Sequence, residues 1–410
     1  MIDYYETKQH PITKKMVLDA YRKVRANKGS AGIDTQSLEQ FEERLAGNLY
    51  KIWNRMTSGS YHPKAVREVQ IPKKSGGYRG LGIPTVSDRV AQQVVKSYLE
   101  PKVEASFHQD SYGYRPNKSA HDALAKTVRN CGYYSWVVDL DIRGFFDNID
   151  HELLMKAVRV YTDEKWIIMY IERWLEVGVA REGKVHKREK GTPQGGVISP
   201  LLANIFLHFV FDKWMEKHHS NMPFQRYCDD AIIHCTTWNQ AVFIRNAVTK
   251  RMKECKLELN SEKTKIVYCK NSIHRESNPV PVSFTFLGHT FRPLGRPTKN
   301  GWKLTYFPCM SQDAKKSVRE KVKSVVNRRF MGKLQDIAQR LNAMARGWIN
   351  YYCVYSRWTV YGLWYWINLK LVRWVMRRKK MGRRRAHQWL RKIYNQNPKL
   401  FIHWTLARPY

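Results

Sequence analysis

The chain has 410 residues, with 72 lysines and arginines against 35 aspartates and glutamates, which gives a formal net charge of +37. Hydrophobic residues make up 43% of the chain, enough for the folded cores of about two to four domains. So large a positive excess repels itself unless a polyanion is the usual partner, which favours nucleic acid over an anionic membrane. The sequence has no signal-like start and no run of about 18 apolar residues, so we expect no membrane association and a soluble, intracellular protein.

The seven cysteines are scattered along the chain and include no Cys-x-x-Cys pair. An odd, dispersed set is typical of a reducing compartment and argues against a zinc site. We therefore expect a cytoplasmic protein without structural zinc.

The first third of the chain predicts helices and one hairpin. Residues 11 to 56 are typical of helices around a polar loop, with Ser37 and Gln40 spaced as a capping box. Residues 66 to 74 alternate apolar and polar side chains, turn at Ser75-Gly76-Gly77 and return as an extended run, which predicts a hairpin.

The middle of the chain mixes the two kinds of element. Residues 86 to 104 are typical of a helix, and Ser119 with Asp122 is placed to cap another. Strands are expected at residues 134 to 141 and 224 to 235, around a helical stretch. The mixture predicts an α+β fold.

From Ser311 the apolar residues recur at helical spacing, which indicates a helical domain. After Asp336 no acidic residue follows, while seven of the 14 tryptophans and a dense run of arginine and lysine fall there. Because no carboxylate neutralises that run, it predicts a nucleic-acid surface, whereas the helical spacing of the tryptophans favours packing for most of them. The cations expected to contact phosphates are Arg373, Arg377, Arg378, Lys379, Lys380, Arg383, Arg384 and Arg385.

Two groups of aspartates carry the candidate chemistry. Asp229 and Asp230 follow Tyr227 and precede an apolar run, the arrangement expected of a tight hairpin that carries metal ligands. Further carboxylates stand at the end of an apolar strand, at Asp139 and Asp141. Nucleotidyl transfer by two magnesium ions needs such hard oxygen ligands, because the ions lie roughly 3.5 to 4 Å apart and share carboxylates. From the residues alone, Asp139 and Asp141 both stay candidates.

Seven sequence blocks occur in one order that is similar to a known family. They are Ile71-Pro72-Lys73 with Arg79, Tyr112-Gly113-Tyr114-Arg115-Pro116, Asp141 with Phe145-Phe146-Asp147, Gly191 to Asn204, Tyr227-Cys228-Asp229-Asp230, Leu259 to Thr264, and Phe286-Leu287-Gly288. With them the chain resembles the reverse transcriptases encoded by group II introns, over nearly its whole length.

The resemblance implies a right-hand polymerase. Residues 1–90 would form an amino-terminal extension and fingers, and residues 91–292 a palm with an antiparallel sheet and the remaining fingers. Residues 302–376 would form a helical thumb or maturase domain, and residues 377–410 a basic DNA-binding tail.

For catalysis, the resemblance assigns Asp141 and Asp229 as ligands of two Mg²⁺ ions, with Asp230 in support. Asp141 is preferred to Asp139 because of its spacing to Phe146. Phe146 would lie beneath the incoming sugar and exclude a 2′-hydroxyl, which predicts a DNA product, whereas Phe145 suits the core.

Other side chains would bind the nucleotide. The resemblance implies that Lys73 and Arg79 hold the triphosphate, although an ordinary charged hairpin stays an alternative. It places Gln194 and Gly195 along the nucleotide and template, with the glycine allowing nucleic acid to approach the backbone.

Four further assignments complete the site. Lys263 would protonate the departing pyrophosphate, with a solvated lysine as the equal alternative, and Arg115 would contact nucleic acid. Cys228 stands where the family commonly has alanine and would shift nucleotide affinity or fidelity. Residues 286 to 288 would grip the primer terminus, with a buried strand turn as the equal alternative.

The expected function is that of an RNA-directed DNA polymerase of a mobile group II intron, which also binds its intron RNA and assists splicing and retrohoming. Its partners would be the intron RNA template, a DNA target or primer and deoxynucleoside triphosphates, in a bacterial cytoplasm or nucleoid. Because no His-Asn-His nuclease block occurs, target-strand cutting is not expected. A splicing-only maturase and a non-intron reverse transcriptase used in phage defence stay open as alternatives.

Overall fold

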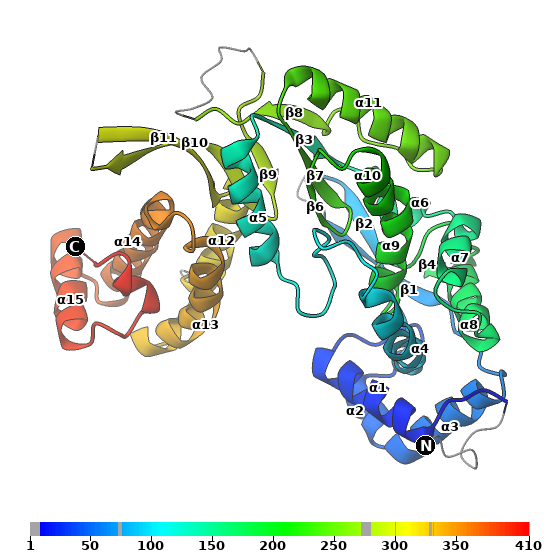
Figure 1. Cartoon of the computed structure of the whole chain (residues 1–410). Coiled ribbons are helices and arrows are strands. Elements are labelled where there is room, and N and C mark those ends of the chain that lie inside the picture. Colours follow the sequence, from blue (N-terminus) through cyan, green and yellow to red (C-terminus); the bar gives the residue numbers. More distant parts are fainter. Residues whose placement is uncertain are drawn as a thin grey trace. The chain divides into compact units, whose positions relative to one another are not determined.

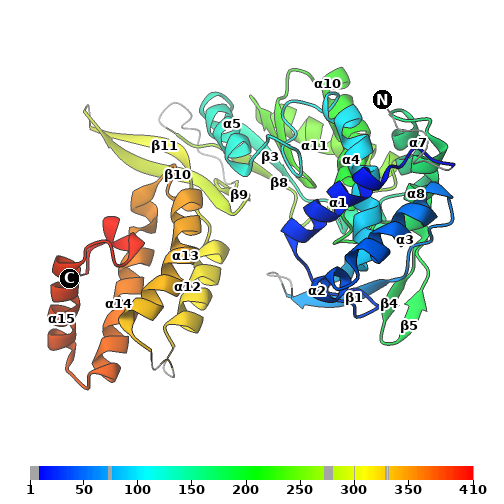
Figure 2. The same ribbon diagram turned by 90° about the horizontal axis from the view of Figure 1, so that it is seen from below.

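The computed structural model describes residues 9–72, 76–271, 280–299, 301–327, 330 and 332–409. Helices and strands are mixed, which confirms the expected α+β class (Figures 1 and 2). The chain divides into two compact units. The first comprises Met1–Ala123, Val138–Ile233 and Trp238–Lys265, and the second Leu124–Val137, His234–Thr237 and Ile266–Tyr410. None of the helices that the structure describes is long and apolar enough to cross a membrane.

The first unit opens with the helices α1 (Lys14–Asn27), α2 (Leu38–Glu42) and α3 (Leu45–Thr57). The Thr13 hydroxyl caps α1 by accepting from the backbone N–H of Met16. At α2, the predicted capping box of Ser37 and Gln40 is present in both directions. The helix α4 (Val86–Glu104) follows, and Figure 2 shows α1 beside it.

A sheet of order β2-β1-β4-β5 lies in the same unit. The predicted hairpin is present as the antiparallel pair β1 (Val66–Pro72) and β2 (Tyr78–Ile83). β4 (Val179–Arg181) pairs parallel with β1 and antiparallel with β5 (Lys184–His186). Lys73, expected to hold the triphosphate, lies outside the described residues.

The strands that carry the candidate aspartates belong to a sheet of order β6-β7-β3-β8. These strands are β3 (Trp136–Leu140), β6 (Phe224–Tyr227), β7 (Asp230–Cys235) and β8 (Lys265–Tyr268). The helices of this region are α5 (Ala120–Tyr133), α6 (Phe145–Asn148), α7 (His151–Arg159), α8 (Lys165–Glu176), α9 (Ser199–Leu207), the π-helix η2 (His208–Asp212), α10 (Lys213–His218) and α11 (Trp238–Glu254). Because β6 and β7 are antiparallel and joined by two residues, the adjacent aspartates lie at a turn, as the sequence predicts.

The second unit contains the antiparallel strands β9 (Phe284–Phe286), β10 (His289–Thr298) and β11 (Gly301–Met310). Its helices are α12 (Gln312–Val325), α13 (Leu334–Tyr352), the 3-10 turn η3 (Arg357–Val360), α14 (Tyr361–Arg378), α15 (Arg383–Gln396) and the 3-10 turn η4 (Ile402–Thr405). The Ser311 hydroxyl caps α12, so the helical body begins where the apolar spacing predicts. Residues 302–310, which the domain prediction counts with the helices, instead form most of β11.

One apolar core extends through α12 to η4. Figures 1 and 2 show α12, α13, α14 and α15 side by side, and Ala386, Leu390 and Trp404 are buried in the same core as Leu341. The expected boundary between residues 376 and 377 therefore falls inside α14 and inside one core. Residues 377–410 are structurally part of the helical body, and their expected DNA contact stays a prediction.

Candidate active site

The turn between β6 and β7 presents the two adjacent aspartates. Tyr227 pairs with Asp230, which leaves Cys228 and Asp229 as a two-residue loop. Cys228 has φ 59°, and a positive φ at the first loop position is typical of the hairpin turns that follow the twist of the strands. A residue other than glycine costs roughly 1–2 kcal/mol in this left-handed region, so contacts around the turn must stabilise it.

Asp141 follows β3 and is held by the 259–264 segment. Its backbone N–H donates to the Thr264 hydroxyl at 3.3 Å, and its carbonyl accepts from the Asn260 N–H at 2.8 Å. The Lys263 ammonium lies 3.9 Å from the Asp141 carboxylate, and that carboxylate side chain is 40% exposed. Two blocks more than a hundred residues apart thus meet at Asp141, and the role of Lys263 stays a prediction.

The aspartates influence one another electrostatically. Burial raises the pKa of Asp229, and the charge of Asp141 adds to the rise. Desolvation by surrounding protein raises the pKa of Asp230 to about 7, with repulsion from Asp229 and then Asp141 contributing. Asp230 is itself exposed, and the two neighbouring carboxylates repel its charged form. Asp141 and Asp229 therefore lie within electrostatic reach of each other.

Asp139 lies in the same acidic region. Burial raises its pKa to about 8, and repulsion from Asp230 and Asp141 adds to the shift while Lys265 opposes it. Burial and repulsion thus both disfavour the charged form of Asp139, which is the form that binds a metal ion. This agrees with the preference for Asp141, whose role as a ligand stays a prediction.

The donor set suits magnesium. The carboxylates offer only hard oxygen atoms, and their mutual repulsion would be relieved by a divalent cation. Among the described residues, no three His, Cys, Asp or Glu side chains form a ready-made metal site. Mg²⁺ usually binds through one or two carboxylates together with substrate phosphates and water, so these aspartates fit a metal that arrives with its nucleotide.

A cavity of about 600 Å³ opens beside Asp229. Five of the predicted site residues line it, namely Arg79, Phe146, Gln194, Gly195 and Asp229. Its other lining residues are Tyr78, Gly80, Leu81, Tyr114, Ile142, Gly144, Phe145, Asp147, Gly196, Ser199 and Pro200. The structure thus brings β2, α6, the 191–200 segment and the catalytic hairpin around one space, while the role of each residue stays a prediction.

The two phenylalanines divide as the sequence predicts. The Phe145 side chain is 2% exposed and packs in the core, whereas Phe146 is half-buried at the cavity. Beside it, the Gln194 amide donates weakly to the Asp147 carboxylate at 3.4 Å. No role was predicted for Asp147 from the sequence, although this residue lines the cavity. Its position directly after Phe146 could have indicated that it lies there.

Gly195 lines the cavity and also lies close to β2. Its φ is +124°, and a Cβ there would lie 2.6 Å from the carbonyl oxygen of Gly82. The neighbouring Gln194 carbonyl accepts from the Gly82 N–H at 2.9 Å. The glycine therefore permits close approach of the β2 backbone, and its contact with nucleotide and template stays a prediction.

Cys228 is also placed differently from the expectation. Its side chain is 4% exposed, and it is not among the cavity-lining residues of the part of the chain that is described. A direct contact with the nucleotide is therefore not supported. Any influence of Cys228 on the nucleotide must act through the shape of the turn.

Comparison with known proteins settles the family. Residues 71–291 match the model of the reverse transcriptase (RNA-dependent DNA polymerase) family, which is more than half of the chain. The chain belongs to the reverse transcriptases. Residues 315–394 match the maturase-specific domain of group II introns, so the predicted identity as a group II intron reverse transcriptase with a maturase domain is confirmed.

Curated relatives agree with this assignment. Protein YkfC of Escherichia coli is 33% identical over 66% of this chain and 78% of its own length. The group II intron-encoded protein LtrA of Lactococcus lactis is 39% identical over 46% of this chain, and the putative COX1/OXI3 intron 1 protein of Saccharomyces cerevisiae is 30% identical over 50%. The alignments with this chain cover 32% of the length of LtrA and 24% of the length of the COX1/OXI3 intron 1 protein.

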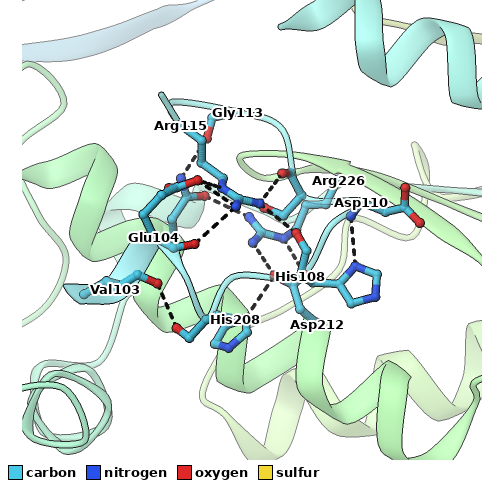
Figure 3. Close-up of polar contacts among 12 residues, drawn as sticks. Val103, Glu104, His108, Asp110, Gly113, Arg115, His208, Asp212 and Arg226 are labelled. Atoms are coloured by element: carbon cyan, nitrogen blue, oxygen red, sulfur yellow. Dashed lines mark hydrogen bonds and ion pairs between the residues drawn. The ribbon is translucent and has the colours of Figure 1, made fainter. Parts of the chain in front are cut away.

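Arg115 of this reverse transcriptase does not act as predicted. Its side chain is 6% exposed and paired with Glu104, with Nη2 2.7 Å from Oε1. The guanidinium also donates to the backbone carbonyls of His108 and Ser111, both at 2.7 Å (Figure 3). Because these bonds use the guanidinium inside the protein, the expected contact with nucleic acid is replaced by a structural role.

The cationic run of the helical body is accessible. All eight predicted phosphate contacts, from Arg373 to Arg385, are exposed on α14, α15 and the loop between them. Trp364 and Trp374 are buried in the core, whereas Trp358 is 54% exposed. Packing therefore accounts for most of these tryptophans, and the arginines and lysines form the free surface.

Proposed function

We propose that the protein copies an RNA template into DNA, as the polymerase of a mobile group II intron. One observation carries the proposal: Asp229 lines a cavity together with Arg79 and Phe146, and the charge of Asp141 acts on the Asp229 carboxylate. Carboxylates and a cationic fork beside one cavity are what a metal-bound nucleoside triphosphate requires.

Each side chain then has a task. Two Mg²⁺ ions held by Asp141 and Asp229, with Asp230 in support, would activate the primer hydroxyl and neutralise the leaving pyrophosphate. Arg79 binds the triphosphate, and the Phe146 ring leaves no room for a 2′-hydroxyl, so deoxynucleotides are selected. Lys263, 3.9 Å from the Asp141 carboxylate, supplies a proton to the pyrophosphate.

The same proposal assigns the parts of a right-hand polymerase. Residues up to about 90 serve as extension and fingers, the β6-β7-β3-β8 sheet as palm, and α12 to α15 as thumb and maturase domain. The maturase match over residues 315–394 supports binding of the intron RNA, with assistance to splicing and retrohoming. A bacterial cytoplasm or nucleoid is the proposed location, and a DNA primer or target the proposed second partner.

Primer extension tests the polymerase. The native protein, an RNA template with a DNA primer, deoxynucleotides and Mg²⁺ should give extended product, and Asp229→Ala should give none. Asp163→Ala serves as the matched control, because Asp163 is an exposed aspartate outside the cavity. Equal product from the native and Asp229→Ala proteins would reject the assignment.

Binding of intron RNA is tested by its salt dependence. If the exposed cations neutralise about 6 to 10 phosphates, affinity should fall roughly a thousandfold or more between 50 and 200 mM salt. Replacing Arg383, Arg384 and Arg385 together by glutamine should reduce the slope of the logarithmic plot by about 3. An affinity that is flat across this range would contradict extensive phosphate contact.

A splicing-only maturase is the second candidate, favoured by the maturase match alone. It predicts that splicing assistance persists in Asp229→Ala and that the native protein makes no DNA. The non-intron reverse transcriptase of phage defence is disfavoured by the same match. Intron RNA domains in the DNA flanking the gene would separate it from the first proposal.

A further inference from the structure

A buried arginine lies two residues before the catalytic hairpin turn. Arg226 is the penultimate residue of β6, and its side chain is 1% exposed. The four hydrogen bonds of its guanidinium are all internal, and Figure 3 shows those to Asp212. Nε and Nη2 donate to the Asp212 carboxylate at 2.7 and 2.5 Å, and Nη1 donates to the Asn204 side chain and to the Cys228 carbonyl, both at 3.0 Å.

The side-chain partners of Arg226 lie on the continuous helical stretch α9–η2 and on the hairpin itself. Asp212 ends the π-helix η2, and Asn204 lies on α9, at the end of the 191–204 block. The Asn204 amide in turn donates to the Gly113 carbonyl at 2.7 Å. Gly113 touches the turn itself, because a Cβ on it would lie 2.4 Å from the Cys228 nitrogen. One guanidinium therefore connects three of the blocks that the sequence places in order.

The backbone of Arg226 is fixed as well. Its N–H donates to the Asp110 carbonyl at 2.9 Å, and its own carbonyl accepts from the Tyr112 N–H at 2.8 Å. The loop that contains Gly113 is thus attached to β6 on one side and to the Asn204 amide on the other. The position of the turn depends on this whole arrangement.

Stability alone is a weak explanation for such an ion pair. Burial would raise the pKa of Asp212, but the charge and hydrogen bonds of Arg226 lower it below its usual value. Both groups are therefore charged. The free energy needed to remove two charges from water is about as large as the free energy gained from their attraction. Apolar residues of similar size therefore often give equal stability. A function in placing neighbouring atoms explains the pair better.

We propose that Arg226 is a positioning residue for the catalytic carboxylate of Asp229, with Asp212 and Asn204 as its supports. The bond from Nη1 to the Cys228 carbonyl holds the left-handed turn in the one shape that aims Asp229 at the cavity. This inference rests on the proposed polymerase function and adds to it a residue that touches neither metal nor nucleotide.

Two single variants separate charge from geometry. Arg226→Lys keeps a cation for Asp212 but lacks the fork that also reaches Cys228 and Asn204. Asp212→Asn keeps the shape but removes the charge that orients the guanidinium. In both we expect kcat on an RNA template to fall about a hundredfold, as for a displacement of about 1 Å, while the KM for deoxynucleotide changes little because Arg79 is untouched.

A double variant keeps the proposal falsifiable if the single variants fold poorly. Arg226→Met with Asp212→Leu removes both charges, so it should recover thermal stability relative to Asp212→Asn. It should nevertheless stay slow, since nothing then holds the Cys228 carbonyl. Native turnover in a stably folded double variant would overturn the proposal.

A second readout does not depend on activity. Hydrogen exchange of the backbone amides of residues 224–235 should be faster in Arg226→Lys than in the native protein, with or without Mg²⁺. The control is Leu99→Ala, a truncation of a fully buried side chain in α4, which should lower the melting temperature without accelerating exchange at the hairpin.

The outcomes distinguish this inference from the proposed function. If the native protein extends no primer, the polymerase proposal fails. If the native protein is active and Arg226→Lys matches it in kcat and in hairpin exchange, only the positioning role fails. A loss of kcat equal to that of Leu99→Ala at equal loss of melting temperature would show a merely structural role.

Discussion

Gly113 offers the most quantitative test of how the catalytic hairpin is placed. An added Cβ would lie 2.4 Å from the backbone nitrogen of Cys228, whereas ordinary contacts begin at 3.4 Å. The obstacle is backbone, so Gly113→Ala must displace the loop or the turn by about 1 Å. A displacement of that size at a reacting centre costs about a hundredfold in rate, and we expect that loss in kcat.

The assay is single-turnover primer extension on an RNA template, with thermal unfolding measured on the same samples. Gly47→Ala is the control, because a Cβ at Gly47 on α3 meets nothing within 4 Å. Alanine in a helix is favoured over glycine by about 1 kcal/mol, so this control should be as active as the native protein and slightly more stable. A Gly113→Ala protein with native kcat would refute the reasoning that the turn needs this close contact.

Three further predictions concern separate parts of the molecule. Phe146→Val should reduce the preference for deoxynucleotides over ribonucleotides by roughly 10- to 100-fold, measured as the ratio of kcat/KM values, and an unchanged ratio would remove Phe146 from sugar selection. Arg115→Met should destabilise the protein by about 3 kcal/mol, because it leaves Glu104 unpaired. The affinity for RNA should stay unchanged. Weaker RNA binding by a protein of native stability would instead support a contact between Arg115 and nucleic acid. Burial lowers the pKa of His403 to about 3. Below about pH 6.5 the unfolded chain therefore binds a proton at this residue and the folded chain does not. The free energy of unfolding should consequently fall by about 2 kcal/mol between neutral pH and pH 5. Urea unfolding of native and His403→Gln proteins at both pH values checks this, and an equal pH slope in the two would contradict it.

Local patterns in the sequence were sufficient for several features. Alternating side chains around a glycine turn predicted the β1-β2 hairpin, and adjacent aspartates before an apolar run predicted the β6-β7 hairpin. Ser37 with Gln40 predicted a helix start. Asp141 was preferred to Asp139 by its spacing to Phe146, and the raised pKa of Asp139 agrees with that preference. These features depend on neighbours in the chain, which a single sequence displays.

Contacts between distant residues were not visible in the same way. Arg115 looked like a free cation, because nothing in the local pattern shows that Glu104 and two carbonyls receive it. The burial of Arg226 depends on Asp212, fourteen residues away and brought round by a π-helix. Residues 377–410 were predicted to be a separate basic tail because most of their cations follow one another in the sequence. Their few core side chains, such as Leu390, are dispersed and form no visible pattern.

In the proposed function, Asp141 and Asp229 hold two ions at the end of a growing DNA strand. A crystal structure of the protein with an RNA template, a terminated DNA primer, an incoming deoxynucleotide and Mn²⁺ in place of Mg²⁺ tests it most directly through anomalous scattering. We predict two peaks about 3.5 to 4 Å apart, both coordinated by carboxylate oxygens of Asp141 and Asp229. A bound nucleotide whose metal lies on Asp139 instead, or on neither carboxylate, would contradict the account.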